Sequence, residues 1–151
     1  MNLITTTLIT AVLSLPFIPS TTHIVVEPQE TPKVLTTGQI TSNKDLLETV
    51  STLAEKYNQD KDLALAIIKC EGQAYKSIGN NKNYKNGQVW STDIGWWQIN
   101  DYYHEKSAQK LGLDIYNEID NLEYGFVLLK EQGTQPWSAS KDCWSKIVAS
   151  R

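Results

Sequence analysis

Hydrophobic residues recur at helical spacing from residue 46 to residue 57, which predicts an amphipathic helix with one apolar face. The members of this face are Leu46, Leu47, Val50, Leu53, Ala54 and Tyr57. Ser42 followed by Asp45 fits the capping pattern of a helix N-terminus. The folded part of the chain is therefore expected to begin near Ser42.

A second helix is expected from Asp60, a suitable N-cap residue, through Glu71. Residues 63–68 are apolar on every side, which predicts that this helix lies in the centre of the core. Because Glu71 follows this apolar stretch directly, its carboxyl group should sit at the edge of the hydrophobic interior.

Two more helices are expected, at residues 101–111 and 122–132, each followed by a glycine. Asp120 or Asn121 is the expected cap of the second of these helices. Residues 136–144 predict a turn and the start of a last short helix. The chain should thus be mainly helical.

The segment between the second and third helices has a different pattern. Residues 79–88 form a loop rich in Asn, Lys and Gly, and Asn86 followed by Gly87 is a strong turn signal. Strand-like residues 88–90 come next. A small antiparallel hairpin carrying Asp93 is expected here, which makes the fold class α+β, mainly α.

The N-terminal part lacks this organisation. Residues 3–18 are mostly apolar but fall short of the roughly 20 residues that a membrane span needs. Residues 1–19 are therefore expected to be a signal peptide or an uncleaved signal anchor, and the protein to be secreted, periplasmic or attached to the cell envelope. Residues 20–41 are rich in Thr, Pro and Glu and predict a flexible linker, followed by one folded domain over residues 42–151.

Charge and cysteine usage exclude several kinds of partner. A net charge of −3 leaves no basic surface for nucleic acid. Cys70 and Cys143 suit one disulfide in an oxidising compartment, or else two separate buried thiols. Neither has ligand spacing to another Cys or His, and His23 and His104 lie in the linker and in a predicted helix. We therefore expect no metal and no cofactor.

Glu71 and Asp93 are the candidate catalytic residues. Burial and the partial negative charge of a helix C-terminus both disfavour an ionised Glu71, so its pKa should rise, as a general acid requires. Asp93, on the strand downstream, would be a second carboxylate that stays ionised and faces an oxocarbenium-like carbon in sugar cleavage. The structural alternatives are a surface glutamate at a helix end and an aspartate that caps nearby backbone.

The run from Ser91 to Asn100, S-T-D-I-G-W-W-Q-I-N, resembles the active-site strand of c-type lysozymes. It also resembles the S-x-D-x-G-x-x-Q-I-N segment of small lytic transglycosylases. With Cys70-Glu71-Gly72 at a helix end, residues 42–144 are identified as a member of the lysozyme-like superfamily. The resemblance implies a lysozyme-like fold whose cleft binds peptidoglycan glycan strands, with Glu71 as general acid, and we expect a monomer that meets the membrane only through its N-terminal segment.

The resemblance also suggests roles for residues of the run. Gly95 would let the backbone pass close to a sugar or to a neighbouring helix. Gln98 would form a hydrogen bond across the cleft floor, either to substrate or to the loop behind Glu71. Asn100 would end the strand and cap the next turn, or else bind substrate. Strand alternation would place Trp96 and Trp97 on opposite faces, one in the core and the other lining the cleft, where we expect Trp97.

Aromatic side chains are candidates for stacking on sugar rings. Tyr103 and Trp137 are the substrate-binding candidates outside the run, and Trp90 and Tyr102 have the same potential. The structural alternative for each is a place in the core.

The type of reaction remains open. A hydrolytic lysozyme would use Asp93 as its second carboxylate. A lytic transglycosylase would instead close the 6-hydroxyl of the substrate onto C1. The lack of the four-disulfide framework of animal lysozymes favours cyclisation, as does the transglycosylase-like segment from Asn121 to Gly125. Alternatives of another class are a non-catalytic glycan-binding module and a component of a secretion or phage apparatus that opens the wall locally.

Overall fold

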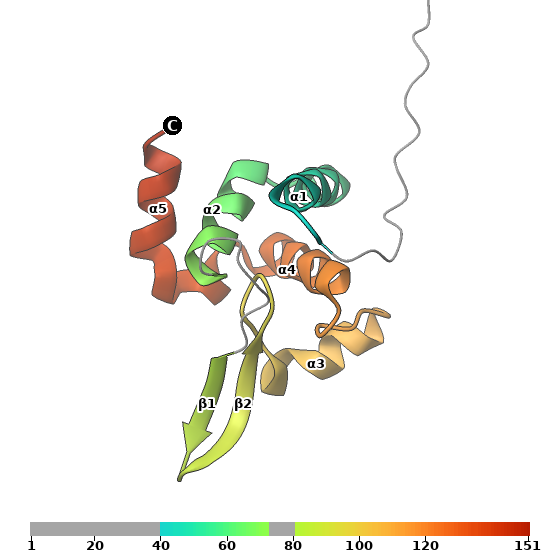
Figure 1. The fold of residues 1–151 in the computed structure, drawn as a ribbon, viewed down its shortest axis with the longest axis vertical. Helices are drawn as coiled ribbons and strands as arrows, with labels where there is room; N and C mark the ends of the chain where they lie inside the picture. The colour runs from blue at the N-terminus through green and yellow to red at the C-terminus, as the bar shows by residue number, and fades with distance from the viewer. Residues whose placement is uncertain (1–39, 73–80) are drawn as a thin grey trace, which may run out of the picture. The chain divides into compact units, whose positions relative to one another are not determined.

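The computed structural model describes residues 40–72 and 81–151, which form a group of helices with a small sheet at one side (Figure 1). The chain order is α1 (Asn43–Tyr57), α2 (Lys61–Glu71), β1 (Asn81–Lys85), β2 (Gln88–Ile94), β3 (Ile99–Asn100), α3 (Asp101–Lys110), α4 (Glu118–Gln132), the 3-10 helix η1 (Gln135–Ser140) and α5 (Lys141–Ala149). The expected α+β, mainly α class is confirmed.

The predicted signal segment, residues 1–19, lies outside the described residues, as does the expected linker apart from its last two positions. Among residues 40–72 and 81–151, no helix combines the length and the apolar character that crossing a membrane requires.

Helix α1 begins as its sequence predicts. Ser42 is the N-cap, and its hydroxyl accepts a hydrogen bond from the backbone N–H of Asp45 at 3.2 Å. The Asp45 carboxylate reaches back to both the backbone N–H and the hydroxyl of Thr41. One expected core position is wrong, because Leu47 is exposed and Thr49 is buried in its place.

Helix α2 lies between α1 and α5 and has its middle in the core (Figure 1). Asp60 caps it by accepting hydrogen bonds from the N–H groups of Asp62 and Leu63, as expected for this cap. Residues 64–68 are buried, which confirms a central position for this helix. The last residue of the helix is Glu71.

The sheet is antiparallel with strand order β1-β2-β3, and α3 packs beside β2 (Figure 1). Asn86 and Gly87 form the turn between β1 and β2, both with positive φ, as the Asn-Gly signal predicts. The segment taken as a loop also contains strand β1. Asn and Lys make up most of β1, so the chain there has no alternation of apolar and polar residues to indicate a strand.

The run from Ser91 to Asn100 is not one continuous strand. Strands β2 and β3 pair through Asp93 with Asn100 and Ile94 with Ile99, and residues 95–98 form the tight turn between them. The prediction that alternation would separate Trp96 from Trp97 is therefore wrong. Both indoles are buried, because turn geometry rather than strand geometry directs them.

Helix α4 packs against this turn. Its cap is Asn117 rather than Asp120 or Asn121, and the Asn117 side chain accepts hydrogen bonds from two N–H groups of the first turn. Asn121 is instead fully buried, and its amide donates to the carbonyls of Ile94 and Ile115 at 3.1 and 2.9 Å. It thereby ties the end of β2 to α4.

Gly125 of α4 is the second residue of this helix that packs closely against the turn. A Cβ atom at this position would collide with the Trp97 indole. With no side chain there, the indole lies on the helix backbone and donates its Nε1–H to the carbonyl of Leu122 at 3.2 Å. Gly125 thus permits close packing against α4, with an indole as the packed group.

Candidate active site

Glu71 lies at the C-terminus of α2, half-buried beside the turn that follows β2. Gly72, the C-cap, sits against the Trp96 side chain, which covers this end of the helix. The Ser140 hydroxyl donates a 2.5 Å hydrogen bond to Oε1 of Glu71. Burial raises the pKa of Glu71, the Ser140 hydrogen bond opposes the rise, and the negative charge of Asp93 adds to it.

Asp93 sits near the end of β2, close enough for its charge to act on Glu71. Its carboxylate accepts a 2.8 Å hydrogen bond from the side-chain amide of Asn100, its cross-strand partner on β3. The same amide is 3.0 Å from the Ser91 hydroxyl, which also accepts a hydrogen bond from Asn83 on β1. Asp93 is thus held by the side chain of a neighbouring strand.

Asn100 occupies the N-cap position of α3, but its side chain makes no capping hydrogen bond. Asn100 therefore ends β3 and stands at the cap of the next helix as expected, but its side-chain amide faces Asp93 and Ser91 instead of the helix N-terminus. Its Oδ1 is buried and accepts no hydrogen bond from the described residues. A buried acceptor without a partner costs about 1–3 kcal/mol, and this one lies on the residue that orients Asp93.

Gly95 and Gln98 hold the turn in shape. Gly95 has a φ of 73°, and a Cβ atom there would collide with the Asn121 side chain on α4. Of the two expected neighbours, a sugar or a helix, it is thus helix α4 whose close approach requires glycine at position 95. Gln98, with a φ of 49°, donates its side-chain amide to the Gly95 carbonyl at 2.8 Å and accepts a hydrogen bond from Asn81 on β1.

The two tryptophans expected to contact substrate are core residues. Trp97 is fully buried, and Trp137 keeps only 4% of its surface exposed. Their rings lie 4.7 Å apart between centroids, and Trp137 Nε1–H donates to the Trp97 carbonyl. They support the turn and η1, and the structure presents neither ring to a ligand.

The third aromatic candidate, Tyr103, belongs to an exposed cluster. The rings of Trp90, Tyr102 and Tyr103 make edge-to-face contacts, with centroids 5.1–6.0 Å apart. All three are exposed, Tyr102 and Tyr103 by more than 60%. Burial of aromatic rings is favourable because it removes a large apolar area from water. The exposed faces of these three rings are therefore available to pack against a ligand.

A β-bulge presents Trp90 at this surface. Asn83 pairs with Ser91 and Tyr84 with Val89, so Trp90 has no partner on β1. Such an extra residue bends the strand and redirects its side chain. Trp90 shares β2 with Asp93, which places the exposed rings and the carboxylate on one strand.

The Cys70–Cys143 disulfide is present, as one of the two sequence interpretations expects. It joins the penultimate residue of α2 to the first turn of α5. Glu71 follows Cys70, and Ser140 immediately precedes α5. The bridge therefore fastens together the two segments that contribute the shortest hydrogen bond of the Glu71 carboxyl.

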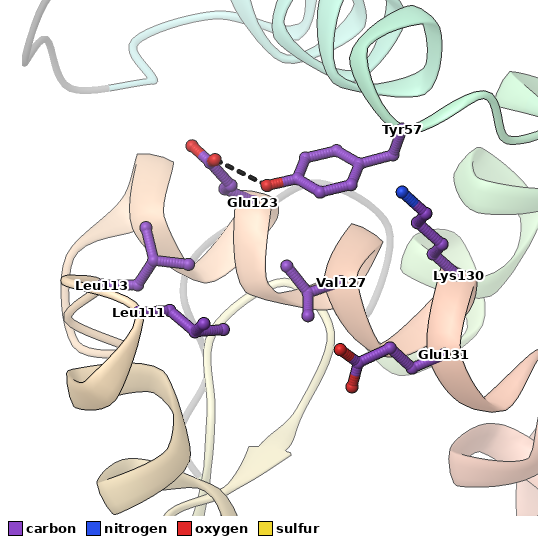
Figure 2. Close-up of a pocket in the computed structure, with 7 residues that line it drawn as sticks. All are labelled: Tyr57, Leu111, Leu113, Glu123, Val127, Lys130 and Glu131. Atoms are coloured by element: carbon purple, nitrogen blue, oxygen red, sulfur yellow. Dashed lines mark hydrogen bonds between the residues drawn. The ribbon is translucent and has the colours of Figure 1, made fainter.

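A second half-buried glutamate gives a useful contrast. Glu123 on α4 lines a pocket of about 350 Å³ with Tyr57, Leu111, Leu113, Val127, Lys130 and Glu131 (Figure 2). Burial tends to raise its pKa, but hydrogen bonds from Lys56 and Tyr57 at 2.6 and 2.7 Å outweigh burial and lower it. Glu123 is thus a paired carboxylate, whereas Glu71 is a carboxyl group biased toward its protonated form.

Sequence reasoning did not single out Ser140 or Asn81. Ser140 contacts Glu71 across 69 positions of sequence, and no local pattern links the two. Within residues 40–72 and 81–151, no group of His, Cys, Asp and Glu side chains is arranged to hold a metal ion.

Comparison with known protein families, with curated proteins and with solved structures finds no significant match in any of the three.

Proposed function

We propose that this chain cleaves the β-1,4 bond between N-acetylmuramic acid and N-acetylglucosamine in peptidoglycan, with Glu71 as the general acid. The observation that carries the proposal is the environment of Glu71. Its pKa is raised by burial and by the nearby charge of Asp93, so the carboxyl group keeps its proton to a higher pH than an ordinary glutamate and can give it to a leaving oxygen.

The residues around this pair support the same chemistry. Asn100 holds Asp93 in place, and an ordered second carboxylate near a protonated one is the arrangement that glycoside cleavage uses. The exposed rings of Trp90, Tyr102 and Tyr103 offer flat apolar faces of the kind on which sugar C–H groups pack. A lysozyme-like fold, suggested by the run from Ser91 to Asn100, is part of the proposal.

Between the two reaction types, we favour the lytic transglycosylase, in which Glu71 acts first as acid and then as base and no cofactor is needed. The alternative is a hydrolytic lysozyme with Asp93 as second carboxylate. We place the activity outside the cytoplasm or in the cell envelope, because the Cys70–Cys143 disulfide requires an oxidising compartment.

A candidate of another class is a glycan-binding module without catalysis. The exposed cluster of Trp90, Tyr102 and Tyr103 favours it, because an aromatic platform alone is sufficient for binding. The raised pKa of Glu71 favours the enzyme, because binding alone does not need a protonated carboxyl group at that place.

Release of soluble fragments from purified peptidoglycan tests the proposal. Glu71→Gln should reduce the rate by at least about 100-fold, because the amide cannot donate the proton. The matched control is Glu123→Gln, which makes the same chemical change at another half-buried glutamate and should leave the rate within about threefold of wild type. A Glu71→Gln protein that folds and still clears the wall at the wild-type rate would contradict the assignment.

A further inference from the structure

The hydroxyl of Ser140 has two hydrogen-bond acceptors within reach but only one proton. Its Oγ lies 2.5 Å from Oε1 of Glu71 and 3.2 Å from the carbonyl oxygen of Trp137. A serine hydroxyl can donate to one acceptor at a time. The shorter contact is with the carboxyl group, and whenever Glu71 is ionised this hydrogen bond is roughly twice as strong as one to a neutral carbonyl.

We infer that Ser140 is a positioning residue that fixes Oε1 of Glu71 and leaves Oε2 to carry the catalytic proton. An oxygen that accepts a hydrogen bond at 2.5 Å is a poor place for the carboxyl proton, because two hydrogens would then point at each other. Oε2 forms no hydrogen bond with the described residues. This inference rests on the proposed function, because the choice of the oxygen that carries the proton matters only if Glu71 transfers that proton to a substrate.

The same contact adjusts how readily Glu71 releases its proton. When Glu71 gives the proton on Oε2 to a leaving oxygen, its carboxyl group becomes an anion and the Ser140 hydrogen bond becomes charge-assisted. Burial and Asp93 raise the pKa of Glu71, whereas Ser140 lowers it. The pKa of Glu71 thus stays above its ordinary value, and the Ser140 hydrogen bond makes that rise smaller than burial and Asp93 alone would make it.

The surroundings hold the Ser140 hydroxyl in one place. Trp137, three residues earlier in η1, is buried and donates its Nε1–H to the Trp97 carbonyl at 2.9 Å. Trp144 donates its own Nε1–H to the Trp137 carbonyl at 3.0 Å. On the other side, Cys143 is bonded to Cys70, the residue before Glu71. Core packing and a covalent bond therefore define the distance between hydroxyl and carboxyl.

Other charges in the described part of the chain do not account for the behaviour of Glu71. Asp93 on β2 is the charged group that acts on its pKa, and η1 carries no ionisable side chain. The charged side chains of α1 and α5, the other elements packed against α2, exert no resolved effect on it; they are Lys44, Asp45, Glu48, Glu55, Lys56, Lys141, Asp142 and Lys146.

The test compares Ser140→Thr with Ser140→Val in the full-length, oxidised protein. The two side chains have nearly the same shape, but only threonine keeps the hydroxyl, so a difference between them reports the hydrogen bond. With valine, kcat for peptidoglycan should fall about tenfold with little change in KM, and the basic limb of the pH profile should move to higher pH. Threonine should restore both. Ser138→Ala, an exposed serine on the same 3-10 helix, should match wild type.

A second measurement separates this inference from the proposed function. The pKa of Glu71 can be followed by NMR of protein labelled with ¹³C at the glutamate carboxyl groups, without any substrate. It should be higher with Ser140→Val than with Ser140→Thr. If the wild-type protein does not cleave peptidoglycan, the proposed function fails, and this titration still decides whether Ser140 controls Glu71. Equal pKa values, or pH profiles that coincide for the two variants, would overturn the inference.

Discussion

At the scale of single residues, Glu71 and Glu123 show how environment divides one residue type into two roles. Both carboxyl groups are half-buried, and burial raises the pKa of each. Glu123 receives hydrogen bonds from Lys56 and Tyr57 that reverse the shift. Among the described residues, Glu71 accepts a hydrogen bond only from the Ser140 hydroxyl, and it faces a like charge on Asp93, so the rise of its pKa remains.

This contrast predicts opposite effects of pH on the stability of the two glutamine variants. The pKa of Glu71 in the folded state is raised above its ordinary value of 4.5, so the folded protein favours the protonated form. Its contribution to stability is therefore complete below about pH 4.5 and lost as pH rises through the folded pKa. Glu71→Gln should raise Tm by about 2–5 °C at pH 8 and change it little at pH 4.

Glu123→Gln is the control of opposite sign. The pKa of Glu123 is lowered, so its contribution to stability is present at neutral pH and lost as pH falls through the folded pKa. This variant should be less stable than wild type at pH 8. Thermal unfolding followed by circular dichroism at both pH values checks the pair, and an unchanged Tm difference for Glu71→Gln across the two would refute the explanation.

At the scale of elements, the helices could be predicted more completely than the turn that forms the site. The caps Ser42 and Asp60 make local hydrogen bonds that their own sequence encodes, so they could be found without a structure. The turn over residues 95–98 requires positive φ at Gly95 and Gln98. It also packs against α4, where Gly95 lies against Asn121 and the Trp97 indole lies against Gly125. Nothing near the turn indicates those partners.

The same limit applies to the site. Glu71 and Asp93 could be singled out because an acid at the end of an apolar helix and an acid on a polar strand are local signals. Ser140 could not, since its role depends on a contact across 69 positions. Trp97 and Trp137 are aromatic and so suit contact with sugars, but packing between the turn after β2, helix α4 and η1 uses both rings in the core.

The disulfide leads to a prediction about how α2 and α5 work together. In the chain-entropy treatment, closing a loop of 73 residues stabilises the folded state by about 4 kcal/mol. Changing both Cys70 and Cys143 to Ser should lower Tm by more than 10 °C. At a temperature where the variant is still folded, kcat should also fall, because the distance between Ser140 and Glu71 is no longer fixed.

Alkylation and mass spectrometry of the native protein provide the first check. The intact chain should resist alkylation and be lighter than the reduced chain by the mass of two hydrogen atoms. Ser51→Ala, on the surface of α1, serves as control for the double substitution, and a double variant with unchanged kcat and Tm would contradict this role for the bridge.

At the scale of the whole molecule, the candidate site combines segments from three parts of the chain. Helix α2 supplies Glu71, β2 supplies Asp93 and η1 supplies Ser140. Trp90, Tyr102 and Tyr103 extend exposed aromatic surface from β2 onto α3. The pKa of Glu71 depends on burial, on Asp93 and on Ser140, which come from different segments. A partly folded chain would therefore lack the shifted pKa of Glu71.

If the proposed cleavage of peptidoglycan takes place, its products decide between the two reaction types. We expect 1,6-anhydro-muramic ends, detected by mass spectrometry of digested wall, because the single acid Glu71 is sufficient for intramolecular cyclisation. Asp93→Asn should then retain most of the activity. It should shift the basic limb of the pH profile to lower pH, since the charge that raises the pKa of Glu71 is gone. Ends heavier by one water molecule, together with an inactive Asp93→Asn, would instead establish hydrolysis with two carboxylates.

The bond between Cys70 and Cys143 also makes most of the described chain a covalent ring, which contains the hairpin, α3, α4 and η1. The tip of the hairpin, Asn86–Gly87, is exposed on this ring, and exposed tips are where proteases usually nick a folded protein. One nick there would release no fragment, because both new ends stay attached through the sulfur atoms. Glu71 and Ser140 flank the bridge and would remain opposite each other, so a single cut at the hairpin tip would leave their contact in place.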